Sequence, residues 1–96
     1  MAKAKTFRVT YDAQADVLYI SLRETPAIRS IEGERGIVWR FDESNQLLGA
    51  TIVDFAELWI GEQAALAHEL SRRFDISALQ ASGLVARAVD NRRNAS

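Results

Sequence analysis

Two acidic side chains, Asp12 and Asp16, are the first residues whose type and spacing suggest chemistry. They flank a predicted turn, and paired carboxylates can coordinate a hard cation or perform acid–base catalysis. Turn formation explains the same pair, because an Asp at the start of a turn accepts a hydrogen bond from the backbone two residues later. We therefore expect Asp12 to close the turn and Asp16 to cap it from the other side, and we predict that the protein is not an enzyme.

The chain has one histidine, His68, and no cysteine. His68 follows a helical pattern beside Glu69, with no second imidazole and no thiolate to share a metal ion. A serine nucleophile would need a base nearby, and no motif places a serine beside His68. The lack of cysteine excludes disulfides and Cys-based zinc sites. The sequence therefore predicts no metal and no cofactor.

Residues 70–77 are similar to the centre of a helix-turn-helix, the motif that places a recognition helix in the DNA major groove. Asp75 occupies the turn position where such motifs prefer glycine. The start of the second helix offers only Ser77 and Gln80 as polar groups, without the basic residues that would meet phosphates. DNA binding through residues 66–89 is the alternative function, and a helical hairpin covering a sheet is the simpler interpretation.

The sequence pattern of the elements that would position these residues changes near residue 55. Before it, apolar and polar residues alternate with a period of two, whereas after it Ala, Leu, Glu and Arg follow a helical period. The alternation predicts strands over residues 7–11, 16–23, 37–41 and 47–53, with a short edge strand over 27–32. Gly49 within the last strand predicts a bulge or a close backbone approach.

The helical half is expected to begin with a short turn over residues 55–60, which Gly61 separates from a main helix starting near Glu62. Ser77 with Gln80 three residues later predicts the start of a second helix. The fold class expected is α+β, with a four- or five-stranded antiparallel meander followed by two C-terminal helices packed on one face. This single domain would comprise a sheet over 7–55, a helical segment over 56–90 and a flexible tail over 91–96.

Apolar side chains lie on both faces of the second predicted strand. Leu18 and Ile20 share one face, while Val17 and Tyr19 share the other. We expect helices to cover one face and a protein partner to cover the other, so we predict a homodimer or a complex with a different protein. The two tryptophans are candidates for the sheet–helix contact or for an exposed patch. The candidate binding residues are Asp12, Asp16, Tyr19, Trp39 and Trp59.

The charges nearly balance, with 12 Lys and Arg against 13 Asp and Glu among 96 residues. That balance argues against a dominant role at nucleic acids or membrane surfaces, where proteins usually carry a basic excess. No apolar run approaches the roughly 20 residues that span a bilayer. The first five residues carry the charges of Lys3 and Lys5 but have no apolar stretch behind them, so no secretory signal is expected. We expect a cytoplasmic location and no membrane partner.

Residues 11–20 read YDAQADVLYI. This segment resembles the opening signature of a family of small bacterial proteins, domain of unknown function 2283: Tyr-Asp, three variable residues, Asp, one residue, then Leu-Tyr-Ile. Residues 36–42 and 47–52 resemble the second block of the family. Two positions depart from it, since Asn45 replaces a usual glycine and Thr51 a usual glutamate.

The resemblance covers residues 7–55 and implies an antiparallel sheet with no assigned activity. Members of the family resemble, in size and setting, the antitoxin partners of small toxin-like proteins encoded beside them. The resemblance therefore implies a protein-interaction module, antitoxin-like in kind, and implies nothing about residues 56–96.

Overall fold

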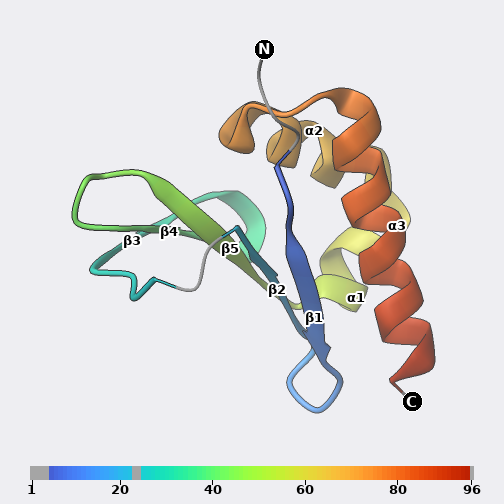
Figure 1. Ribbon diagram of the computed structural model, residues 1–96. Helices are drawn as coiled ribbons and strands as arrows, with labels where there is room; N and C mark the ends of the chain where they lie inside the picture. Colours follow the sequence, from blue (N-terminus) through green and yellow to red (C-terminus); the bar gives the residue numbers. More distant parts are fainter. Residues whose placement is uncertain (1–4, 23–24, 96) are drawn as a thin grey trace.

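The computed structural model describes residues 5–22 and 25–95, which form a five-stranded antiparallel sheet followed by helices (Figure 1). The strands are β1 (Arg8–Asp12), β2 (Val17–Ser21), β3 (Arg29–Glu32), β4 (Ile37–Phe41) and β5 (Leu47–Val53). Three sequence-based expectations concern residues outside the described ones. They are the absence of a secretory signal at residues 1–4, the end of the second strand at Arg23 and the flexibility of the last tail residue, Ser96. The α+β class and the antiparallel sheet are confirmed, and β3 is the expected edge strand.

The order of the strands across the sheet is β1-β2-β5-β4-β3. After β2 the chain crosses to the far edge, and β3, β4 and β5 return as consecutive antiparallel neighbours. In a sequential meander β3 would instead lie beside β2. Pairing β2 with β5 places Leu18 opposite Ile52 and Ile20 opposite Ala50, all four with no exposed surface. Burial of these apolar side chains favours the observed order.

The helical layer consists of α1 (Phe55–Trp59), a 3₁₀ turn η2 (Ile60–Glu62), α2 (Gln63–Phe74) and α3 (Ala78–Asn94). The break at Gly61 is confirmed. The predicted cap of α3 is also confirmed, because the Gln80 backbone N–H donates to the Ser77 hydroxyl over 3.0 Å. The expected end of the helical segment near residue 90 is wrong. The helix continues to Asn94, since the Asn91 side chain donates to the Val9 carbonyl at 2.8 Å and fixes this turn against β1.

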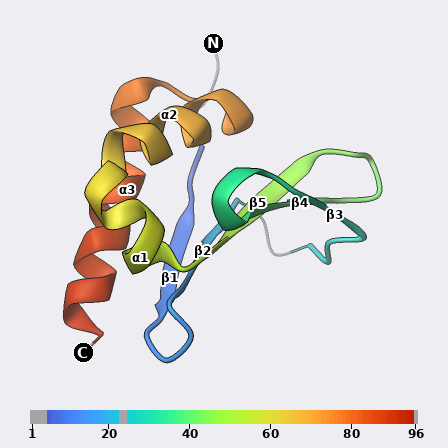
Figure 2. The ribbon, with the colours of Figure 1, turned by 180° about the vertical axis from the view of Figure 1, so that it is seen from behind.

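All three helices lie on one side of the sheet, as the front and back views show (Figures 1 and 2). The helices and one sheet face share a single core. Its largest fully buried side chains include Trp39, Ile37, Phe55, Trp59, Leu66 and Leu70. The prediction that the helices pack on one face is therefore confirmed, and the opposite face of the sheet has no described helix packed on it.

Candidate functional site

The turn of the first hairpin is closed by Asp12, as expected. Its Oδ1 accepts hydrogen bonds from the backbone N–H groups of Gln14 at 3.0 Å and Ala15 at 3.3 Å. The turn ends at Asp16, whose φ of 55° lies in the left-handed region that Asp tolerates better than most residues. Asp12 thus has the role that turn chemistry predicts.

Asp16 reaches beyond its own turn to the start of the helical layer. Its carboxylate accepts the backbone N–H of Ala56 at 2.9 and 3.1 Å, and its main-chain carbonyl accepts the N–H of Phe55 at 3.1 Å. The Tyr11 hydroxyl donates to the same carboxylate over 2.6 Å. Asp16 therefore caps α1 from another element, because Asp54, the residue that precedes this helix, makes no side-chain cap. Asp12 and Asp16 serve different partners and do not form a joint carboxylate site.

These contacts set the ionisation of both side chains in the cap. Partial burial alone disfavours the charged form of Asp16, but hydrogen bonds from Tyr11, Ala56 and Glu57, with the positive charge of Arg92, hold the pKa of this carboxyl below its ordinary value. The hydrogen bond to Asp16 in turn raises the pKa of the Tyr11 phenol. Asp16 is therefore ionised and Tyr11 protonated near neutral pH, and neither is tuned for proton transfer there.

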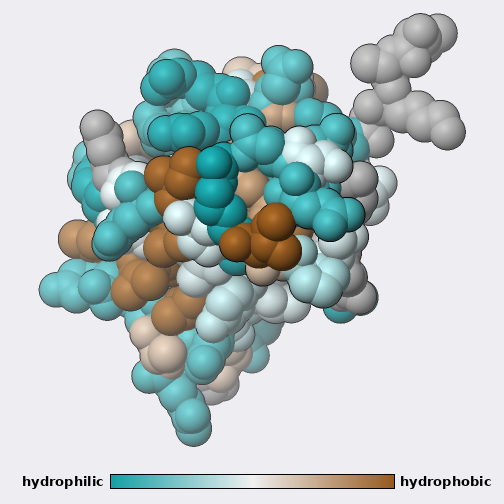
Figure 3. Space-filling model, turned by 90° about the vertical axis from the view of Figure 1, so that its left-hand side faces the viewer, coloured by the Kyte–Doolittle hydropathy of each residue, from teal (hydrophilic) through white to brown (hydrophobic). Residues whose placement is uncertain are grey.

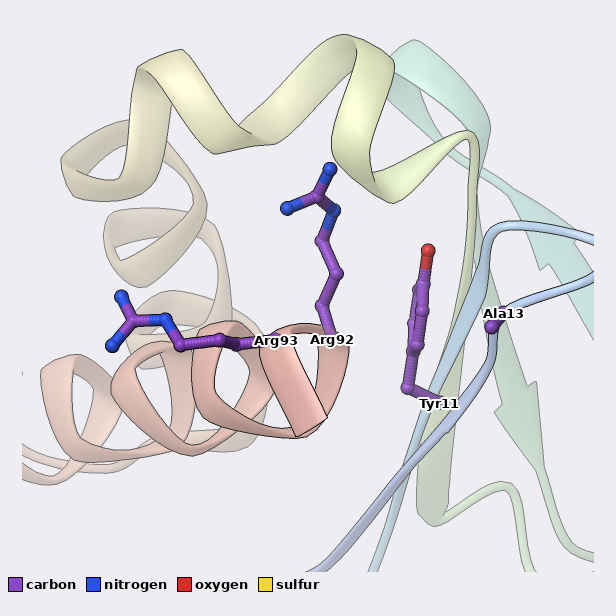
Figure 4. A pocket seen from close by; sticks show the side chains of 4 residues that line it. All are labelled: Tyr11, Ala13, Arg92 and Arg93. Atoms are coloured by element: carbon purple, nitrogen blue, oxygen red, sulfur yellow. The ribbon is translucent and has the colours of Figure 1, made fainter. Parts of the chain in front are cut away.

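An open pocket of about 380 Å³ borders this cap and is lined by Tyr11, Ala13, Arg92 and Arg93 (Figure 4). The Arg92 and Tyr11 side chains extend in the same direction, toward α1, whereas Arg93 points away along α3. The charge of Arg92 already stabilises the Asp16 carboxylate. We therefore assign the pocket to the structure of the cap and do not assign it a ligand.

Both tryptophans belong to the sheet–helix contact and not to an exposed patch, since Trp39 is 1% and Trp59 2% exposed. Trp39 packs edge-on against Phe74 at 5.9 Å between ring centroids. The Arg35 guanidinium lies 4.2 Å from the centre of a Trp59 ring, and Arg35 also forms an ion pair with Glu62. These contacts join the turn before β4 to the helices, so neither tryptophan is available to a partner.

Tyr19, the remaining candidate, lies on the sheet face opposite the helices, here called the open face. Strand register aligns Thr10, Tyr19, Thr51, Val38 and Glu32 in one row across all five strands. Tyr19 is 38% exposed, and Val53, one row along β5, is 37% exposed. The open face therefore combines aromatic and β-branched side chains that the described helices leave uncovered.

A positive charge is fixed on the open face by Arg40. Its guanidinium lies over Gly49, where an added Cβ would come within 2.7 Å of the Arg40 Nη2, and it donates to the Ser21 hydroxyl at 3.3 Å. Gly49 also approaches the Ile20 carbonyl closely, and the register shifts beside Arg40, so both expectations for this glycine are confirmed. Arg40 and Thr51 were not predicted from the sequence as open-face residues. Alternation gives the side of its own strand on which each residue lies, but the two rows to which they belong follow from the strand order, which local pattern does not encode.

The α2–α3 hairpin contains the segment similar to a helix-turn-helix. Asp75 adopts a φ of 55° and so takes the left-handed conformation that glycine usually supplies in such turns. The exposed residues in the first turn of α3 are Ala78 and Leu79, and the first basic residue of the helix, Arg87, donates to the Phe7 carbonyl over 3.2 Å. This arrangement fits a helical hairpin that covers a sheet and gives no support to the DNA-binding alternative.

His68 is exposed on α2. Across residues 5–22 and 25–95, no three His, Asp or Glu side chains gather closely enough to hold a metal ion. None of the described helices combines the length and apolar character needed to cross a bilayer.

Comparison with known proteins gave one result. The model of a family described as "Protein of unknown function (DUF2283)" matches residues 8–55, half of the chain. No curated protein and no solved structure matches the chain. The matched region comprises the sheet and ends at Phe55, the first residue of α1, so it includes the Tyr11–Asp16 cap. The chain belongs to the DUF2283 family of proteins of unknown function.

Proposed function

We propose that this protein is a non-catalytic protein-interaction module that binds its partner through the open face. The observation that carries the proposal is the row of Tyr19, Thr51 and Val38, with Val53 beside it, on the face where no described helix packs. Partly exposed aromatic and β-branched side chains on a rigid sheet provide the apolar centre of a protein interface.

The chemistry of this face also indicates the kind of partner. Arg40 is held against Gly49 and Ser21, so its charge is fixed near the apolar row before a partner arrives. A preorganised guanidinium pairs well with a carboxylate, and arginine is enriched at protein interfaces. A partner surface that offers apolar side chains beside an Asp or Glu would complement the open face.

We further propose that the partner is a small toxin-like protein and that the complex forms in the cytoplasm. The support is the resemblance of DUF2283 members to antitoxins, together with a chain free of cysteine. A neutralising protein acts by covering a surface and needs no reacting groups of its own. The engagement of Asp12 and Asp16 in turn and cap hydrogen bonds is consistent with such a role.

A tagged chain expressed in its source organism tests the proposal. We expect the wild type to retain a stoichiometric partner and Thr51→Arg, at the centre of the open face, to lose it. Ser82→Arg is the matched control, because it adds the same charge at an exposed position of helix α3 and should leave capture of the partner unchanged. Circular dichroism confirms that each variant is folded. A wild type with no stoichiometric partner, or a Thr51→Arg variant that still captures one, contradicts the proposal.

A further inference from the structure

The edge of the sheet formed by β3 is exposed along all four of its residues and lies farthest from the helices (Figure 1). The Gly33 N–H donates to the Ile37 carbonyl at 2.7 Å, so the backbone groups of Gly33 face β4. In an antiparallel ladder the direction of these groups alternates along the strand. Those of Ile31 therefore also face β4, while the N–H and C=O groups of Ser30 and Glu32 point away from the sheet.

The opposite edge, at β1, is closed by side chains of α3. Arg87 donates to the Phe7 carbonyl at 3.2 Å, and Asn91 donates to the Val9 carbonyl at 2.8 Å. These bonds occupy outward carbonyls that another strand would otherwise use. Within residues 5–22 and 25–95, β3 is therefore the sheet edge that can accept a further strand.

We infer that β3 pairs with β3 of a second copy of this chain, antiparallel about a two-fold axis at Ile31. In this register Ser30 of each copy lies opposite Glu32 of the other. Their outward backbone groups then exchange four hydrogen bonds. The two Ile31 residues face each other as a non-hydrogen-bonded pair, and the two sheets become one sheet of ten strands.

The side chains of β3 favour this occupant and this register. Ile31 is 43% exposed, so its contact with a second Ile31 removes apolar surface from water. Arg29 lies opposite Gly33, which has no side chain to collide with it. On the open face, the antiparallel copy places its Glu32 opposite Ser30, in the row that also holds Arg40, so this row combines unlike charges from the two copies.

Other registers are less favourable. A shift of two residues in one direction places Glu32 opposite Glu32, and like charges directly opposite are destabilising. The shift in the other direction separates the two Ile31 side chains.

Figure 3 views the molecule from the β3 side and shows hydrophobic side chains gathered there among hydrophilic ones. Ile28, just before β3, adds to the exposed apolar surface near this edge.

The β3 edge is a different surface from the open face, to which the proposed function assigns the partner. Failure of the dimer would leave the proposed function intact, and failure of the proposed function would leave the dimer intact. The ten-stranded sheet would join two open faces into one continuous surface, which would strengthen binding to a partner with two sites. Thr51→Arg should leave the dimer intact, because its side chain lies on the face and not at the edge.

Sedimentation velocity over a concentration series is the first test. We expect a reversible shift from the 10.7 kDa monomer toward twice that mass. Ser30→Pro should keep the protein monomeric, since proline removes an outward N–H and spares the bonds to β4. Ser30→Thr is the matched control and should dimerise like the wild type. A wild type that stays monomeric at every concentration, or a folded Ser30→Pro variant that still dimerises, overturns the inference.

Oxidative cross-linking tests the register and does not depend on the proline variant. The two Ile31 Cα atoms of a non-hydrogen-bonded pair lie about 4.5 Å apart, within the range that a disulfide spans. Because the chain has no cysteine, Ile31→Cys introduces a single thiol. We expect it to form a covalent dimer at least tenfold faster than Leu79→Cys, although Leu79 is 85% exposed and so more accessible. Equal rates for the two variants contradict the register.

Discussion

Asp16 and Ala56 are separated by 40 positions in the chain, yet the Ala56 N–H donates to both carboxylate oxygens of Asp16, at 2.9 and 3.1 Å. The bond links the end of the first hairpin to the first turn of the helical layer. The Tyr11 hydroxyl holds the same carboxylate from the neighbouring strand. Two residues of the family signature therefore determine where the helices start relative to the sheet.

Replacing Asp16 by alanine should lower the free energy of unfolding through loss of this cap. Asp54→Ala is a matched control, because Asp54 also has a positive φ beside α1 but makes no side-chain cap. The strain of alanine in the left-handed region is then common to both variants. We expect Asp16→Ala to be less stable than Asp54→Ala by about 1 kcal/mol, measured by urea denaturation. Equal stabilities would show that the cap contributes nothing.

The stability that Asp16 provides should depend on pH in a defined direction. Because its pKa is lower in the folded than in the unfolded protein, the contribution is present above the unfolded value and is lost as pH falls through the folded one. The stability difference between wild type and Asp16→Asn should stay constant from about pH 8 to 5 and shrink below about pH 4. A difference that grows on acidification contradicts this assignment.

The contribution of Tyr11 to stability should depend on pH in the opposite direction, and alkaline pH tests it. The hydrogen bond to Asp16 raises the Tyr11 pKa above its ordinary value of 10.0, so its contribution is present below that value and is lost as pH rises through the folded pKa. Denaturation of wild type and Tyr11→Phe should give a constant stability difference up to about pH 9 and a shrinking one above about pH 10. A constant difference across this whole range would contradict the role of the phenol proton.

The local sequence pattern predicted those features of the fold that depend on neighbouring residues, namely strand bounds and a helix start. The alternation around Trp39 and in residues 47–53 gave the bounds of β4 and β5, and Ser77 with Gln80 gave the start of α3. The strand order was not predictable in this way, because it depends on which apolar faces pair in the centre of the sheet. Asp16 illustrates the same limit: its local turn was expected, but its bond to Ala56 requires the helices in place.

Two further features depend on long-range contacts and so were not predictable from local pattern: the end of α3 and the set of residues that surround Tyr19 on the open face. Asn91 lies in a polar segment that reads as a frayed tail, yet its side chain bonds the Val9 carbonyl of β1. Tyr19 was assigned to the second sheet face by alternation, and the structure places it there. Its neighbours Thr51 and Val38 follow only from the pairing of β2, β5 and β4.

Gly49 should tolerate no side chain, whereas Gly83 should benefit from one. A Cβ at Gly49 would lie 2.4 Å from the Ile20 carbonyl oxygen, a backbone atom of the neighbouring strand β2, so the sheet must shift. Such overpacking costs about 1–3 kcal/mol. A Cβ at Gly83 meets nothing within 4 Å, and alanine in an exposed helix interior stabilises by about 1 kcal/mol. Thermal denaturation should therefore move in opposite directions for Gly49→Ala and Gly83→Ala, and shifts of the same sign would contradict the packing described.

Asn91 should contribute to stability although it lies near the chain end. Asn91→Ala leaves the Val9 carbonyl without its partner from α3 and should lower the free energy of unfolding by about 1–2 kcal/mol. Asn94→Ala is the control, because Asn94 is exposed at the last residue of the same helix, and its replacement should change stability by less than about 0.5 kcal/mol. Urea denaturation of both variants beside the wild type measures the difference. If both variants match the wild type, the last turns of α3 do not help to hold β1 in place.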